Sequence, residues 1–271
     1  MSENTGPKIY LLPNLMTAGN LCCGFLATLK ILEGALAEKV QSTDATYSFQ
    51  LAIGCILAAC IFDALDGRVA RLGGNESAFG REFDSIADIV SFGVAPALMV
   101  HRIVLHETPN LGWMVASIYL VCGALRLARF NCLAAADSAA ANREFKGFPI
   151  PAAAGLVASL TLFMLWLSNN RLETWLAKWV FPALLIFLSW MMFSGFKYPS
   201  FKSINWRTTR SVPKFILIVA ILIFTIMNYQ WMPFAIFTSY LLYGFLRPFL
   251  SRKMKQEIEE EVEEDEPLES P

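Results

Sequence analysis

Long apolar segments, separated by short polar ones, make up most of the chain. They lie at residues 13–32, 49–65, 82–105, 111–130, 145–167, 175–194, 212–227 and 231–250. A helix needs about 20 mostly apolar residues to cross the hydrocarbon core of a bilayer. The pattern predicts an all-α integral membrane protein, a polytopic helical bundle of about eight transmembrane helices, with Pro96 as a candidate kink in the third.

The two ends of the chain differ from this apolar body. Residues 1–12 predict an N-terminal tail that lies along the membrane interface, and residues 13–250 predict one membrane domain. Residues 251–271 are first basic and then acidic, and they hold too few apolar side chains to fold alone. We therefore expect a solvated, disordered C-terminal tail.

The composition agrees with a membrane protein. Hydrophobic residues make up 55% of the chain and charged residues 17%, so we expect membrane lipids, and no nucleic acid, around it. The six cysteines lie in or beside apolar segments and include no CxxC pair. That distribution is typical of free thiols used in packing, and not of a zinc site or a disulfide framework.

Basic residues are distributed unevenly between the two sides of the predicted bundle. With eight spans, both termini and the loops after even-numbered spans share one side, and 17 of the 22 Lys and Arg residues fall there. Loops rich in Lys and Arg face the cytosol in membrane proteins. We therefore expect both termini, and the acidic stretch described next, to lie in the cytosol. We also expect the membrane to be a bacterial-type inner or cell membrane.

Four carboxylates lie where the second span ends and the third begins. The stretch reads DALDGRVARLGGNESAFGREFDSIAD, and helical spacing places Asp63 with Asp66 on one face and Asp84 with Asp88 on another. Four acids that face each other across two helices repel unless a cation lies among them. Oxygen ligands of this kind suit Mg²⁺ or Mn²⁺, and four carboxylates can hold two such ions. The sequence predicts a divalent-metal site at a membrane surface.

Other small and polar residues are candidates for substrate binding near these acids. Gly67, Ala70 and Gly80 carry little or no side chain on the acidic faces. Their size allows a nucleotide to approach the backbone, and it also allows helices to pack closely. Their position within the acidic motif favours the nucleotide. Thr17 and Asn20 share one face of the first span, where such groups either bond to neighbouring helices or face a cavity.

Two arginines stand at the end of the fourth span, in the sequence RLARFN. Arg126 and Arg129 are three residues apart and therefore share a helical face. They suit bidentate recognition of a carboxylate or a phosphate, and they also suit an anchor to anionic headgroups. Asn131 and Lys146 are weaker candidates for the same pocket.

The acidic stretch follows the pattern Asp-x2-Asp-Gly-x2-Ala-Arg-x8-Gly-x3-Asp-x3-Asp. This pattern resembles the signature of the CDP-alcohol phosphatidyltransferases at all eight defining positions, which are Asp63, Asp66, Gly67, Ala70, Arg71, Gly80, Asp84 and Asp88. The resemblance implies a six-helix core followed by two C-terminal helices. It also implies a homodimer.

The resemblance further implies roles for single residues. Asp63, Asp66 and Asp84 would be mainly metal ligands, and Asp88 would be the general base and also touch a metal. The first helix would border the nucleotide pocket. Arg71 would support the nucleotide or its phosphates, although the residues alone equally allow an anchor that extends to the interface.

Flanking stretches extend the resemblance over roughly residues 10–250. PNLMTAGNLCCGF, FDSIADIVSFGVAPA, RLARFN and FKGFPIPAAAG are similar to the phosphatidylserine synthase branch of the family. This similarity implies transfer of the phosphatidyl group from CDP-diacylglycerol to the hydroxyl of L-serine, which produces phosphatidylserine and CMP.

Two alternatives stay open. Another CDP-alcohol phosphotransferase would use glycerol phosphate, inositol phosphate or another alcohol, and Arg126, Arg129, Arg143 and Lys146 would suit a phosphorylated acceptor. A cation transporter would spread carboxylates through several spans near mid-membrane, whereas here they gather around one turn.

Overall fold

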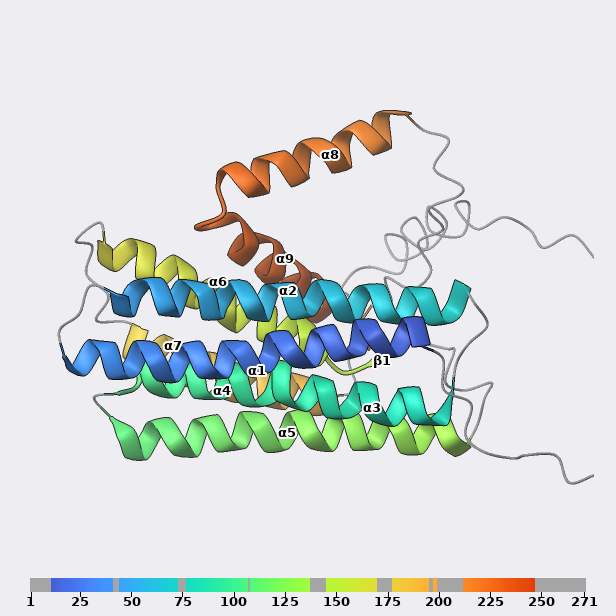
Figure 1. The fold of residues 1–271 in the computed structure, drawn as a ribbon, viewed down its shortest axis with the longest axis horizontal. Coiled ribbons are helices and arrows are strands. Elements are labelled where there is room, and N and C mark those ends of the chain that lie inside the picture. Colours follow the sequence, from blue (N-terminus) through green and yellow to red (C-terminus); the bar gives the residue numbers. More distant parts are fainter. Residues whose placement is uncertain are drawn as a thin grey trace, which may run out of the picture.

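The computed structural model describes residues 11–40, 44–72, 77–106, 108–136, 145–169, 177–194, 197–198 and 212–246. Most of both expected tails, residues 1–10 and 251–271, lies outside these ranges. Each predicted apolar segment is mainly helical within them (Figure 1), although the fifth begins with a short strand and a link, residues 145–149, before its helix. The elements in chain order are α1 (Leu11–Lys39), α2 (Asp44–Leu72), α3 (Ala78–Asp88), η1 (Ile89–Val94), α4 (Ala95–Met99), η2 (Val100–Val104), α5 (Pro109–Ala136), β1 (Phe145–Lys146), α6 (Ile150–Asn169), α7 (Ala177–Phe193), β2 (Lys197–Tyr198), α8 (Val212–Met227) and α9 (Met232–Leu246).

Five helical segments of the described chain are long and apolar enough to cross a membrane. They are Leu11–Lys39, Ala45–Val69, Ala78–Val104, Pro109–Cys132 and Ile150–Ser168. Helices α7, α8 and α9 are also apolar but have only 17, 16 and 15 residues, which is short for the hydrocarbon core at 1.5 Å per residue. The prediction of an all-α polytopic membrane protein is confirmed, with five helices of spanning length in the described residues.

The first two helices are longer than the sequence analysis predicted. α1 continues to Lys39 instead of ending near Leu32, and α2 runs from Asp44 to Leu72. Residues 33–39 (EGALAEK) contain no proline and are mostly good helix formers, so nothing in this segment ends the helix at the edge of the apolar run. The first half of the acidic stretch is consequently part of α2 itself.

The third segment runs as one helix from α3 to η2 but changes its hydrogen-bond pattern near Pro96. The Ala95 amide donates to Val90 and the Leu105 amide to Val100, which are the i→i+5 bonds of wide π-helical turns. Pro96 has no N–H, so it cannot donate to the Phe92 carbonyl. The Tyr119 hydroxyl on α5 donates to that carbonyl instead, at 3.0 Å.

Helix α1 lies between α2 and the third segment (Figure 1). Gly34 of α1 sits against the Phe49 ring, where an added Cβ would lie 2.5 Å from the ring. Gly24 sits against Ser91, and an added Cβ there would collide with both its side chain and its backbone. The lack of a side chain at Gly34 lets α1 pack closely on α2, and the lack of one at Gly24 lets it pack on the segment that follows Asp88.

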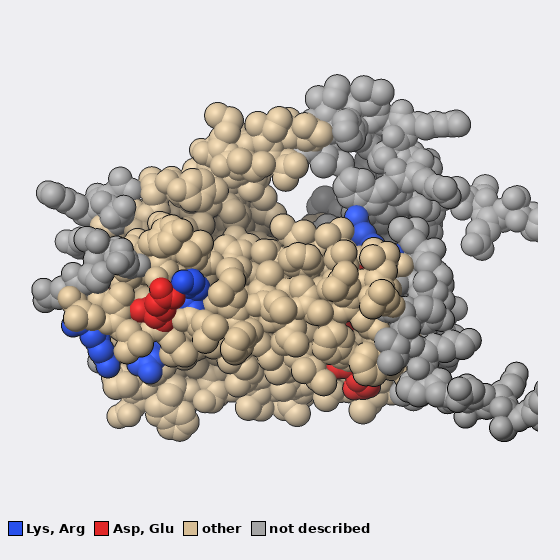
Figure 2. Space-filling model, viewed as in Figure 1, with Lys and Arg blue, Asp and Glu red and all other residues tan. Residues whose placement is uncertain are grey.

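Charged side chains gather at the two ends of the helical bundle on the face shown in Figure 2. The broad band between them carries none on this face. Exposed apolar side chains are numerous on the long helices; examples are Phe25, Leu29, Ile61, Trp113 and Val121. An uncharged band between charged ends is the surface expected of a protein that crosses a bilayer.

The segment before α6 is attached to α7 through its backbone. The Phe148 amide donates to the Met191 carbonyl at 3.1 Å, and Gly147 has a φ of 88° beside the Met192 carbonyl. Gly147 is therefore needed both for its left-handed conformation and for its lack of a side chain. The two-residue antiparallel pair β1–β2, which the sequence analysis did not predict, lies next to this segment.

Candidate active site

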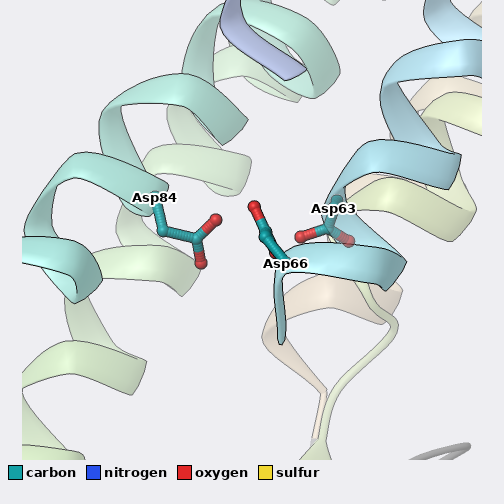
Figure 3. A group of neighbouring side chains, drawn as sticks. All are labelled: Asp63, Asp66 and Asp84. Atoms are coloured by element: carbon teal, nitrogen blue, oxygen red, sulfur yellow. The ribbon is translucent and has the colours of Figure 1, made fainter. Parts of the chain in front are cut away.

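Three aspartates from two helices meet at one end of the bundle. Asp63 and Asp66 lie near the end of α2, and Asp84 lies on α3 (Figure 3). One carboxylate oxygen from each lies within 4.8 Å of the other two. Asp66 is buried, while Asp63 and Asp84 are partly exposed. The sequence prediction that these acids come together is confirmed for these three.

The chemistry of this cluster suits a divalent cation. Three ionised carboxylates this close together repel each other, and the repulsion is large where water is partly excluded. A divalent cation removes the repulsion, and carboxylate oxygens are the ligands that Mg²⁺ and Mn²⁺ prefer. The residues present therefore fit a divalent metal, with Asp63, Asp66 and Asp84 as its ligands.

Asp88 lies one helical turn after Asp84 and outside the group of three. It is 6% exposed, and its Oδ1 accepts a hydrogen bond of 3.1 Å from the Asn20 side-chain amide. It interacts electrostatically with the three other carboxylates, Asp63, Asp84 and Asp66. Asp88 is thus next to the cluster, and one of its oxygens is held from α1.

Thr17 holds a second carboxylate from the same face of α1. Its hydroxyl lies 3.0 Å from Asp66 Oδ2 and 3.2 Å from the Pro13 carbonyl. The single hydroxyl proton can serve only one acceptor at a time, and the ionised carboxylate is the stronger. Of the two sequence interpretations for this polar face, the structure shows bonds to neighbouring helices, and the bonded groups are the site's own acids.

The small residues of the acidic motif differ in their surroundings. Gly80 follows the Ser77 cap of α3, and its amide donates to Ser77 Oγ at 3.0 Å. An added Cβ at Gly80 would lie 3.2 Å from that oxygen and 3.3 Å from Asn14 Oδ1. Gly67 lies on α2 and is partly exposed. The side chains of Ala70 and Arg71 lie outside the described residues.

The two arginines of α5 differ in their surroundings. Arg126 is 9% exposed, and it interacts electrostatically with Asp88 and Asp63 as well as with Tyr240 on α9. Arg129 is exposed. The two arginines, three residues apart on α5, thus differ in burial, and only Arg126 is enclosed by the bundle.

Asn131 and Lys146, the two weaker candidates, are described to different extents. The Asn131 side-chain amide donates to Ser85 Oγ at 2.9 Å, which links α5 to α3 beside the acids. The backbone of Lys146 is part of β1, and its side chain lies outside the described residues. Tyr240 was missed by the sequence analysis, because a tyrosine in an apolar segment carries no motif.

Comparisons with known proteins agree with this geometry. Residues 10–193 match the family described as CDP-alcohol phosphatidyltransferase. A Helicobacter pylori protein named CDP-diacylglycerol–serine O-phosphatidyltransferase is 35% identical over 242 residues, which are 88% of this chain and 91% of that protein. A relative of the same name from Bacillus subtilis is 32% identical over 70% of this chain and 91% of its own length. One from Mycobacterium leprae is 37% identical over 67% of this chain and 57% of its own length.

Proposed function

This chain belongs to the CDP-alcohol phosphatidyltransferase family, and we propose that it transfers the phosphatidyl group from CDP-diacylglycerol to L-serine. The products are phosphatidylserine and CMP, and the protein is a transferase of phospholipid biosynthesis. The observation that carries this assignment is the likeness, over 88% of the chain, to a protein of that named activity. The three convergent carboxylates supply the matching chemistry.

The metal site of the proposed enzyme consists of Asp63, Asp66 and Asp84, with Asp88 as an additional contact. These residues would hold two divalent ions, either Mg²⁺ or Mn²⁺. When bound, the ions would polarise the diphosphate and neutralise the charge of the leaving phosphate. Thr17 orients the Asp66 carboxylate through its hydroxyl. Gly67, Ala70 and Gly80 leave room for the nucleotide beside the helices, and Arg71 supports its phosphates.

Asp88 acts as the general base in this proposal. Its carboxylate takes the proton of the serine hydroxyl, and the serine oxygen forms a bond to the phosphorus that bears diacylglycerol. The bond between that phosphorus and the oxygen of the CMP phosphate breaks, and CMP leaves with the bonding electrons. The Asn20 amide holds Asp88 Oδ1, which orients the carboxylate while Oδ2 receives the proton.

Arg126 is the residue we assign to the acceptor. A free amino acid carries a carboxylate, and a guanidinium binds it through two parallel hydrogen bonds. The buried position of Arg126 near Asp88 places this charge beside the proposed base. Arg129 is exposed and suits an anchor to headgroups better, while Asn131 and Lys146 keep only a supporting role.

The orientation in the membrane follows from the distribution of charge. The acids lie at the end of the bundle where α1 begins and α2 ends. The side that carries 17 of the 22 basic residues is the same side, so we propose that the site faces the cytosol. The single domain over residues 13–250, the two tails and the homodimer stay predictions.

The experiment uses the full chain in detergent with CDP-diacylglycerol and either Mn²⁺ or Mg²⁺. CMP release is measured with L-serine, glycerol 3-phosphate and inositol phosphate in parallel, and Asp88→Asn is the matched control. We expect metal-dependent release of CMP with L-serine and with neither of the other two acceptors. We expect the Asp88→Asn variant to release no CMP. Release of CMP with another alcohol would replace serine as the assigned acceptor. If folded protein released no CMP with any acceptor, the transferase assignment would fail and a cation transporter would become the better interpretation.

A further inference from the structure

Arg126 is a buried charge with one polar atom, Nε, that no hydrogen bond satisfies in the part of the chain that the structure describes. Its side chain is 9% exposed, its buried Nε has no hydrogen-bond partner, and it forms no ion pair within these residues. A buried guanidinium is costly unless hydrogen-bonding partners of opposite charge surround it. Asp88 and Asp63 interact with the guanidinium electrostatically but form no ion pair with it in the described residues. The unpartnered Nε therefore indicates a place where a bound anion can accept a hydrogen bond.

Of the described groups that interact electrostatically with Arg126, which are Asp88, Tyr240 and Asp63, Tyr240 lies outside the acidic motif. The Tyr240 hydroxyl interacts electrostatically with the Arg126 guanidinium. Its ring lies against the ring of the fully buried Phe148, with centroids 5.8 Å apart. Phe148 is itself fixed to α7 through its backbone amide. The phenol therefore has a rigid apolar support on one side and a charged group near its hydroxyl.

Helix α9 is firmly attached to the bundle by the face that carries Tyr240. The Phe237 ring fills the space beside Gly155 of α6, so that an added Cβ there would collide with it. The Phe234 ring stacks on Phe163 with centroids 5.6 Å apart and planes 8° from parallel. Residues 234, 237 and 240 follow at helical spacing, so one face of α9 makes all three contacts.

We propose that α9 completes the acceptor pocket, in which Tyr240 and Arg126 together bind the carboxylate of the acceptor. The proposal rests on the proposed function, and it assigns a role in specificity to a helix beyond residue 193, where the family match ends. A phenol hydroxyl donates one hydrogen bond, and the guanidinium donates two from its fork. The anion that they share is a carboxylate or a phosphate, and the acceptor and the donor are its two possible sources.

The test compares kinetics of wild type and Tyr240→Phe, which removes only the hydroxyl and keeps the ring beside Phe148. We expect the KM for L-serine to rise about tenfold or more, as for loss of a hydrogen bond to a charged group. The KM for CDP-diacylglycerol should stay unchanged, and the preference for serine over ethanolamine, which lacks the carboxylate, should fall. Tyr229→Phe is the matched control, since Tyr229 is 54% exposed in the turn before α9.

A double-mutant cycle with Arg126→Lys sharpens the result. If both groups bind one carboxylate, the fold-changes in KM for serine do not multiply in the double variant. An unchanged KM for serine in an active Tyr240→Phe variant overturns the inference. A rise in the KM for CDP-diacylglycerol alone also overturns it, because that result would assign Tyr240 to the donor phosphate. Wild-type protein that releases no CMP with serine contradicts the proposed function instead.

Discussion

Asn20 connects two parts of the candidate site through one residue. Its side-chain amide donates to Asp88 Oδ1, and its backbone carbonyl accepts a hydrogen bond of 2.9 Å from the Ser91 hydroxyl. Gly24, one turn later, lets the backbone of α1 lie against Ser91. The carboxylate that we assign as the base is thus held by α1, at a point where α1 and η1 are locked together.

The residue-scale prediction is that Asn20→Leu lowers kcat by roughly 10- to 100-fold, because the buried Asp88 carboxylate loses a charge-assisted hydrogen bond that orients it. The KM for CDP-diacylglycerol should change little. Ser91→Ala is the matched control, since it removes the bond to the Asn20 backbone and leaves the amide. A raised KM for CDP-diacylglycerol with unchanged kcat would mean that Asn20 serves the nucleotide and not the base.

The sequence was sufficient to predict the acids but not what holds them. Asp63, Asp66 and Asp84 follow helical spacing on two neighbouring segments, so their convergence could be predicted from local geometry. The bonds from Thr17 to Asp66 and from Asn20 to Asp88 join residues 49 and 68 positions apart. Pairings over such separations depend on which helix faces which, and periodicity does not specify that.

At the scale of elements, the third segment shows how a proline is accommodated inside a long buried helix. Pro96 deprives the Phe92 carbonyl of its usual donor, and wide turns lie on both sides of α4. Tyr119 is fully buried and gives the carbonyl a hydrogen bond from α5. The sequence analysis identified Pro96 as a disturbance of the helix, but the compensating partner on another helix was out of its reach.

Tyr119→Phe should destabilise the protein by about 1–3 kcal/mol, since it leaves a buried carbonyl without its hydroxyl donor. Unfolding of purified protein in mixed micelles measures the change, and Tyr47→Phe is the control because Tyr47 is 64% exposed. Equal stability of the two variants would show that the Phe92 carbonyl is satisfied within its own helix.

The whole molecule has two charged ends, and they are chemically different. One end holds the acids, Arg126 and the start of α1, and the other holds the Lys30–Glu33 ion pair, with 2.6 Å between nitrogen and oxygen. The helical bundle and its uncharged band could be predicted from hydropathy alone. The packing of α9 on α6 could not, because an aromatic face in an apolar helix looks the same whether it contacts lipid or protein.

The prediction at this scale concerns the side of the membrane on which each end lies. In a variant without its native cysteines, Glu38→Cys should react with a membrane-impermeant maleimide in intact cells, and Glu82→Cys only after permeabilisation. Both positions are exposed, at opposite ends of the helical bundle. Labelling with the reverse pattern would place the acidic cluster outside the cell.

The uncharged band seen in Figure 2 has a consequence for how the reaction depends on concentration. A donor with two acyl chains reaches the site by diffusing within the leaflet, whereas serine and CMP exchange with the bulk solution. The reaction rate should therefore depend on the mole fraction of CDP-diacylglycerol in the membrane or micelle, and not on its bulk concentration. Dilution with inert detergent at constant donor concentration should slow the enzyme, and dilution with buffer at constant composition of the micelle should not.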